Sequence, residues 1–76
     1  MDFDFFIEQF KEQFDETDMS LFHRETDFKN LPEWSSLTAL SIIAMVDQNF
    51  RIRINGDDIR SAKTIEDLFQ IIISKI

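Results

Sequence analysis

Residues 34–50 read WSSLTALSIIAMVDQNF, and the spacing of their apolar side chains predicts an amphipathic helix that begins at Ser35 or Ser36. A serine at this position is a ready N-cap, because its hydroxyl can accept a hydrogen bond from a free backbone amide of the first turn. We expect one face of the helix to be buried. That face consists of Leu37, Leu40, Ile43, Ala44, Val46 and Phe50.

Two further long helices are predicted at the ends of the chain. Over residues 2–15, apolar side chains recur at helical spacing, at Phe3, Phe6, Ile7, Phe10 and Phe14. The last helix begins with Thr64 as its N-cap, and two acids follow in the first turn, where the helix dipole favours negative charge. Its buried stripe consists of Ile65, Leu68, Phe69, Ile72, Ile73 and Ile76.

The connections between these helices differ in length. Residues 16–35 have no helical period and predict a long loop held by scattered aromatic and aliphatic anchors. Residues 51–56 predict an extended connection and residues 57–62 a short helical turn, with Ile54 and Ile59 pointing inward. We therefore expect an all-α fold, a small four-helix bundle with three longer helices and one short helix, forming a single domain over residues 1–76. The first helix should run antiparallel to the second, and the fourth should pack beside both.

The net charge of −7 comes entirely from the first part of the chain. Residues 1–33 hold ten acids and three bases, whereas residues 34–76 hold five of each. Nucleic acid and anionic membranes are poor partners for such a surface, because both require basic patches. Basic protein surfaces are better partners, although acidity alone also keeps a small protein soluble. No apolar run is long enough to span a membrane and the start lacks a basic signal region, so a cytoplasmic location is expected.

The residue inventory gives no sign of catalysis or of a metal site. With no cysteine and one histidine, a Cys/His zinc site is excluded. We expect no catalytic residue, because the acids fall on solvent faces and His23 lies beside Arg24 in a polar loop. The pair Asp57-Asp58 is predicted to serve a helix N-terminus, since adjacent residues on a helix point in different directions.

Two consecutive serines stand where the loop meets the second helix. A serine hydroxyl at a helix N-terminus is exposed, and the helix dipole there favours a phosphate attached to it. One of the pair Ser35-Ser36 can cap the helix while the other remains available for chemistry. The simpler interpretation of the pair is N-capping alone.

Several stretches resemble the acyl carrier protein family. They are residues 33–40 (EWSSLTAL), Phe50, Ile54, residues 64–68 (TIEDL) and, upstream, Thr26-Asp27-Phe28 with Leu31 and Trp34. The resemblance covers about residues 26–69, and the length and helix order agree for the remainder. In that family the serine of an Asp-Ser-Leu motif opens the second helix and carries a 4′-phosphopantetheine arm. The matching residue here is Ser36, which Leu37 follows as the motif requires.

The resemblance implies a carrier that holds acyl groups as thioesters and delivers them to enzymes of fatty-acid, polyketide-like or related biosynthesis. Its implied partners are a phosphopantetheinyl transferase (the holo-synthase) and acyl-transferring and ketosynthase-type enzymes, and we expect a monomer. Two alternatives remain open. One is a peptidyl or aminoacyl carrier of a specialised pathway, and the other is an unmodified helical adaptor that binds a basic partner through the acidic first half.

The chain departs from the family pattern in two respects. Ser35 occupies the position of the usual aspartate, which leaves open which transferase would activate the protein. Between Ser36 and Phe50 only Asp47 is charged, whereas family members present several acids there to basic enzymes. These differences favour a specialised pathway over general fatty-acid synthesis.

The resemblance also implies surfaces beyond the attachment site. We expect Leu37, Met45 and Ile54 to take part in partner docking, although Ile54 is as readily interpreted as a core residue. Between deliveries the acyl chain would rest in a slot opened by movement of the short helix at 57–62. Nine phenylalanines compete for the same interior volume. Besides Ile54, the slot would be lined by Ile43, Val46, Ile59, Ala62 and Leu68.

Overall fold

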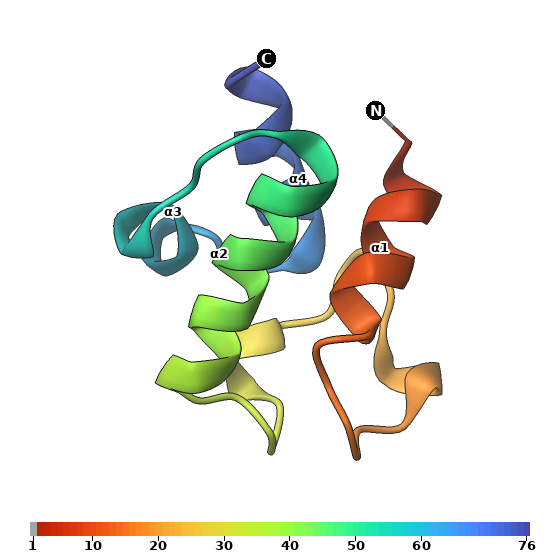
Figure 1. Cartoon of the computed structure of the whole chain (residues 1–76). Coiled ribbons are helices and arrows are strands. Elements are labelled where there is room, and N and C mark those ends of the chain that lie inside the picture. The colour runs from red at the N-terminus through yellow and green to blue at the C-terminus, as the bar shows by residue number, and fades with distance from the viewer. Residues whose placement is uncertain (1) are drawn as a thin grey trace.

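The computed structural model describes residues 2–76, which form the predicted all-α fold (Figure 1). Three longer helices and one short helix are present, as expected, and no strand occurs over the described range. The helices are α1 (Phe3–Lys11), α2 (Ser36–Phe50), α3 (Gly56–Ser61) and α4 (Ile65–Ser74). The long loop between α1 and α2 contains two short 3₁₀ turns, η1 (Met19–Leu21) and η2 (Phe28–Asn30).

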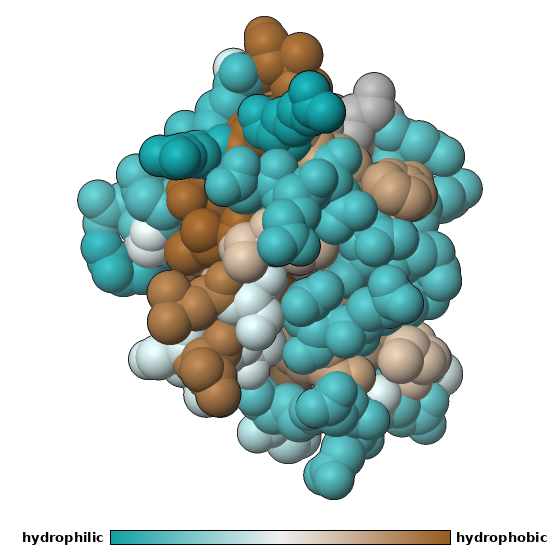
Figure 2. Space-filling view, viewed as in Figure 1, coloured by the Kyte–Doolittle hydropathy of each residue, from teal (hydrophilic) through white to brown (hydrophobic). Residues whose placement is uncertain are grey.

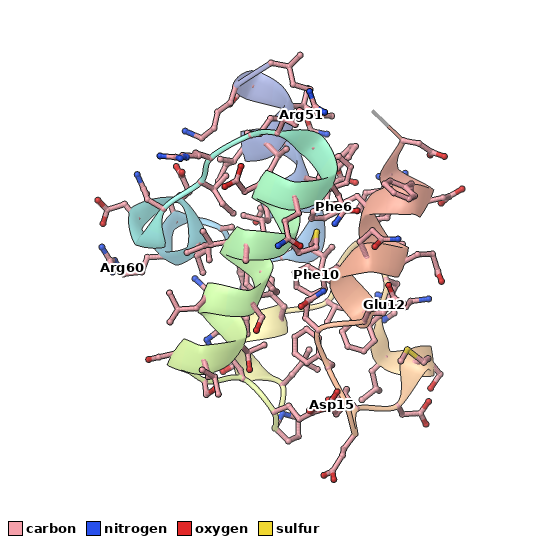
Figure 3. All side chains as sticks on the ribbon, viewed as in Figure 1. Phe6, Phe10, Glu12, Asp15, Arg51 and Arg60 are labelled. Atoms are coloured by element: carbon pink, nitrogen blue, oxygen red, sulfur yellow. The ribbon has the colours of Figure 1, made fainter. Side chains whose placement is uncertain are left out.

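The four helices are in contact with one another in pairs. Helix α1 runs antiparallel to α2, as predicted, and contacts both α2 and α4, while α3 packs against α4 (Figure 1). Phe6 and Phe10 point from α1 toward α2 (Figure 3). The Phe6 ring lies 6.0 Å from Phe50 of α2 and 5.4 Å from Phe69 of α4, measured between ring centroids. One fully buried aromatic side chain therefore joins three helices.

Aromatic residues also hold the long loop against the core, as the sequence predicts. Phe28 of η2 is fully buried between the Phe10 ring, at 5.5 Å, and the Trp34 ring, at 5.2 Å. Phe22 is buried beside Phe14, with ring centroids 5.0 Å apart. The loop is thus a packed part of the domain that leads to the start of α2.

Helix α1 is shorter than the predicted helix, which reached residue 15. Its regular hydrogen bonding ends at Lys11, and after the following turn the backbone amides of Asp15 and Glu16 donate to the carboxylate of Glu33, at 2.9 and 2.7 Å. Phe14 remains buried through a tight turn, in which its amide donates to the Lys11 carbonyl at 3.0 Å. A carboxylate distant in the sequence therefore holds the segment that follows the helix.

The buried face of α2 differs from the prediction. Its fully or almost fully buried residues are Ile42, Met45 and Val46, whereas Leu37 is 75% and Leu40 63% exposed. Apolar residues occupy most positions from 37 to 46, so the sequence pattern did not select one face. Contact with α1 selects the face in the folded chain, and the predicted burial of Leu37, Leu40 and Ala44 is wrong.

Capping residues define the remaining elements. Arg51 ends α2 in the left-handed conformation, with φ of 57°. Asn55 and Asp58 form a capping box for α3, which begins one residue earlier than predicted. Thr64 caps α4 with the side chain of Asp67, as predicted. None of the helices in the described range is long and apolar enough to cross a membrane.

Candidate functional site

The two serines at the start of α2 have different roles. Ser35 is the N-cap: its backbone is extended, and its hydroxyl accepts a hydrogen bond from the Thr38 amide at 3.3 Å. Ser36 is the first residue of the helix and is exposed. Its hydroxyl makes no hydrogen bond to the described part of the chain. The predicted division between a capping serine and an available serine is therefore present, with Ser36 as the available one.

The loop that leads to Ser36 is fixed at several points. The Thr38 hydroxyl donates to the Glu33 carbonyl at 2.9 Å, which ties the first turn of α2 back to the loop. The Trp34 amide donates to the Leu31 carbonyl at 3.0 Å, and the indole packs edge-on against Phe28. The Ser36 backbone is thus positioned by contacts on its N-terminal side as well as by the helix.

The Glu33 side chain connects this junction to the end of α1. Besides the two amides described above, its carboxylate accepts a hydrogen bond from the Thr17 hydroxyl at 2.5 Å. The hydrogen bond from this hydroxyl lowers the pKa of Glu33 below its ordinary value, and the amides of Glu16 and Asp15 lower it further. Desolvation of the carboxylate raises the pKa, but by less than the Thr17 hydroxyl lowers it. Sixteen residues separate Thr17 from Glu33, so no local sequence pattern predicts the contact.

The electrostatic character of the α2 N-terminus differs from that of the other helices. Acids occupy the first turn of α1, α3 and α4, but none occupies the first turn of α2. Its free backbone amides and positive dipole end are therefore not neutralised by a carboxylate of the same turn. An anionic group attached to Ser36 would meet this uncompensated end.

The three predicted docking residues are not all on the surface. Leu37 is highly exposed, but Met45 and Ile54 are only 3% and 4% exposed and belong to the core. Met45 lies nine positions after Ser36, about two and a half helical turns, and so faces the opposite side of α2. The expectation that Met45 contributes to a docking surface is wrong, and the alternative interpretation of Ile54 as a core residue is confirmed.

The predicted acyl slot is closed in this conformation. Val46, Ile59, Ala62 and Leu68 are buried in one cluster, and Ile43 packs against that cluster half-buried. No pocket is found among residues 2–76. An acyl chain would therefore need these side chains to separate before it could enter.

Helix α3, the element expected to move, is held by a lysine that the sequence reasoning missed. Lys29 Nζ donates hydrogen bonds to the carbonyls of Ile59 and Arg60, at 3.1 and 2.9 Å. A residue of the long loop thus binds two carbonyl groups at the C-terminal end of α3. Asp58 Oδ2 lies 3.4 Å from Lys75 Nζ beyond α4. The only sequence signal was a basic residue in a loop, which carries no information on its partner.

Three titratable residues that the sequence singled out make contacts with close neighbours in the chain. Asp58 accepts a hydrogen bond from the Asn55 amide at 3.0 Å, and Asp57 pairs with Arg60, so the predicted helix N-terminal role of the two acids is confirmed. His23 is exposed and lies 3.2 Å from the Glu25 carboxylate. Among the described residues, no three histidine or acidic side chains are grouped as metal ligands would be.

Comparisons with known proteins give no family assignment. No family model matches the chain, and neither the curated proteins nor the solved structures contain a significant match. The acyl carrier resemblance consequently depends on the residues quoted above and on the geometry around Ser36.

Proposed function

We propose that the protein is an acyl carrier, which holds acyl groups as thioesters on a 4′-phosphopantetheine arm attached to Ser36. The observation that carries the proposal is the division of roles at the start of α2, where Ser35 caps the helix and leaves the exposed Ser36 hydroxyl without a partner among the described residues. The four-helix order and the acid-free first turn of α2 support the same proposal.

Attachment of the arm would use Ser36 as a nucleophile. Its Oγ attacks the phosphorus that bears pantetheine in coenzyme A, and a new phosphoester bond forms. The bond from that phosphorus to the bridging pyrophosphate oxygen breaks, and adenosine 3′,5′-bisphosphate leaves. The serine proton passes to a base of the phosphopantetheinyl transferase, and the magnesium ion of this reaction belongs to the transferase. The negative phosphodiester then remains at the positive end of the α2 dipole.

The carrier role itself requires no catalytic group on this chain. A thioester on a flexible arm is presented at high effective concentration to whichever acyl-transferring or ketosynthase-type enzyme binds the carrier. We propose that the protein acts as a monomer in the cytoplasm, in a fatty-acid, polyketide-like or related pathway. A peptidyl or aminoacyl load on the same arm, delivered in a specialised pathway, is the variant of this proposal.

An unmodified helical adaptor is the second candidate. It is favoured by the exposed acids on the solvent side of α1 and the following turn, which would suit a basic partner. These acids include Asp4, Glu8, Glu12 and Asp15.

Co-expression with a phosphopantetheinyl transferase of broad specificity separates the two candidates. A carrier gains the mass of one phosphopantetheine group and one new thiol that reacts with a maleimide, a clear signal in a chain without cysteine. An adaptor keeps its original mass with every transferase tried.

A further inference from the structure

Helix α2 presents an exposed apolar band that starts beside Ser36. The band consists of Leu37, Leu40 and Ile43, of which the two leucines are 75% and 63% exposed and Ile43 is half-buried. Figure 2 shows hydrophobic residues gathered along α2 on its side nearer α3, whereas the surface over α1 is mostly hydrophilic. Exposed apolar side chains gathered at one place on a small domain indicate an interaction site.

The charges around the band are distributed unevenly. Asp47 is the only charged residue of α2, and the helix is followed by two exposed arginines, Arg51 and Arg53. Neither arginine has an ion-pair partner within the described range, whereas Arg24 and Arg60 each have one. Arg51 lies at the C-terminal end of α2 (Figure 3). Two guanidinium groups without an ion-pair partner in the described range therefore follow the end of α2 farthest from Ser36, beyond the last residue of the band.

We propose that α2 docks a protein partner whose contact surface combines an apolar hollow with carboxylates about 22 Å from the position of the arm, the length of α2 between Ser36 and Arg51. This inference rests on the proposed carrier function and specifies its partner. The apolar hollow would cover Leu37 and Leu40, and the carboxylates would pair with Arg51 and Arg53. The acidic surface of α1 would remain in solvent and repel partners that dock the wrong way round.

Two other occupants fit the band less well. An anionic lipid surface would meet only two basic residues on a protein of net charge −7, so electrostatic attraction to it is weak. A second copy would bury both bands permanently and close the surface that surrounds Ser36. A transient protein partner with its own carboxylates can cover the two leucines and form ion pairs with the two arginines at the same time.

A pair of designed helical peptides tests the partner chemistry without requiring the arm. Both peptides carry leucines along one face; one ends in two glutamates and the other in two lysines. Titration into the ¹⁵N-labelled unmodified protein should move the amide signals of residues 37–53, and the acid-ended peptide should bind at least about tenfold more tightly. Arg51→Glu with Arg53→Glu should reverse the preference, and Leu40→Gln should weaken both peptides.

The matched control changes the opposite surface. Glu12→Lys with Asp15→Lys alters two exposed acids near the end of α1 and should leave both affinities within about twofold, because α1 lies outside the contact. Melting curves verify that every variant is folded. Equal affinities for the two peptides, no binding of either, or signal changes on α1 would overturn the inference. Binding to anionic phosphatidylglycerol vesicles that is stronger than binding to either peptide would overturn the inference in favour of a lipid surface. A dimer detected by light scattering would overturn it in favour of a second copy of the chain.

The peptide assay and the arm assay fail independently. A protein that accepts the arm but does not distinguish the peptides contradicts the docking inference alone. A protein that distinguishes the peptides but is never modified at Ser36 contradicts the carrier function alone.

Discussion

Glu33 and Thr17 join the two ends of the long loop, because the Thr17 hydroxyl donates a 2.5 Å hydrogen bond to the Glu33 carboxylate. The same carboxylate accepts hydrogen bonds from the amides of Asp15 and Glu16, so the Glu33 side chain joins the segment after α1 to the residues that lead into α2. The start of α2, and with it Ser36, is therefore tied to the segment that follows α1 through a contact that spans the loop.

The first prediction concerns the pH dependence of this contact. Because the pKa of Glu33 is lower in the folded chain, its ionisation contributes stability above the ordinary glutamate value of 4.5, and this contribution is lost as the pH falls through the lower folded pKa. Glu33→Gln should therefore melt at a lower temperature than the parent protein at pH 7, and the difference should narrow below pH 4.5. Glu25→Gln, at an exposed position, is the control. A difference that is constant across this range would contradict the assignment.

The second prediction concerns the aromatic core. Phe28→Ala should cost about 3–5 kcal/mol, because it leaves a cavity between Phe10 and Trp34. A domain of this size has a total stability of about the same magnitude, so the variant should be largely unfolded by circular dichroism at 25 °C. Phe5→Ala, at a ring that is 46% exposed, should remain folded. Comparable losses in both variants would show that Phe28 is not a principal anchor of the loop.

The third prediction concerns the left-handed residue that ends α2. Arg51 is the only residue other than glycine with a positive φ in the described chain. Glycine adopts this conformation without steric cost, so Arg51→Gly should raise the free energy of unfolding by about 0.5–1 kcal/mol in urea titrations. Arg53→Gly, where φ is not positive, should lower stability or leave it unchanged. A lower stability for Arg51→Gly would contradict the conformational argument.

The fourth prediction concerns the opening of α3. Lys29→Met removes the ammonium group that binds the Ile59 and Arg60 carbonyls but keeps an apolar stem of similar length. Loss of these hydrogen bonds should increase amide exchange in residues 57–62 by roughly tenfold, equivalent to about 1.4 kcal/mol, with a smaller change in α1. A uniform change across all helices would mean that Lys29 supports the whole fold instead of restraining α3.

Acyl loading provides a fifth prediction at the same element. A medium-length chain on Ser36 that enters the slot should raise the melting temperature above that of the unloaded holo form, because it binds the native state alone. Amide exchange at 57–62 should change with it, since the closed core must open there. Equal melting temperatures and unchanged exchange would place the chain in solvent.

The parts of the fold that the sequence predicted correctly depend on local signals. Helix α4 begins where Thr64 and Asp67 form a capping box, and both residues lie within one turn. The start of α2 at Ser35–Ser36 was also predicted from a local signal. The Ser35 hydroxyl accepts its hydrogen bond from the Thr38 amide, which lies in the first turn of the same helix.

The parts that were missed depend on distant contacts. Glu33 holds the segment after α1 and Lys29 holds α3, and each side chain acts across more than fifteen residues. The buried face of α2 could not be predicted, because the helix carries apolar residues on all its sides. Only packing against α1 determines that Met45 is buried and Leu40 is exposed.

Intact mass of matched serine variants tests the carrier function most directly. Ser35→Ala and Ser36→Ala are each co-expressed with the same phosphopantetheinyl transferase, and circular dichroism confirms that both are folded. We expect Ser35→Ala to gain the mass of one phosphopantetheine group and Ser36→Ala to gain none, because Ser35 caps α2 and Ser36 presents the free hydroxyl. Modification of Ser36→Ala together with an unmodified Ser35→Ala, or no modification of the parent protein by any transferase, would contradict this expectation.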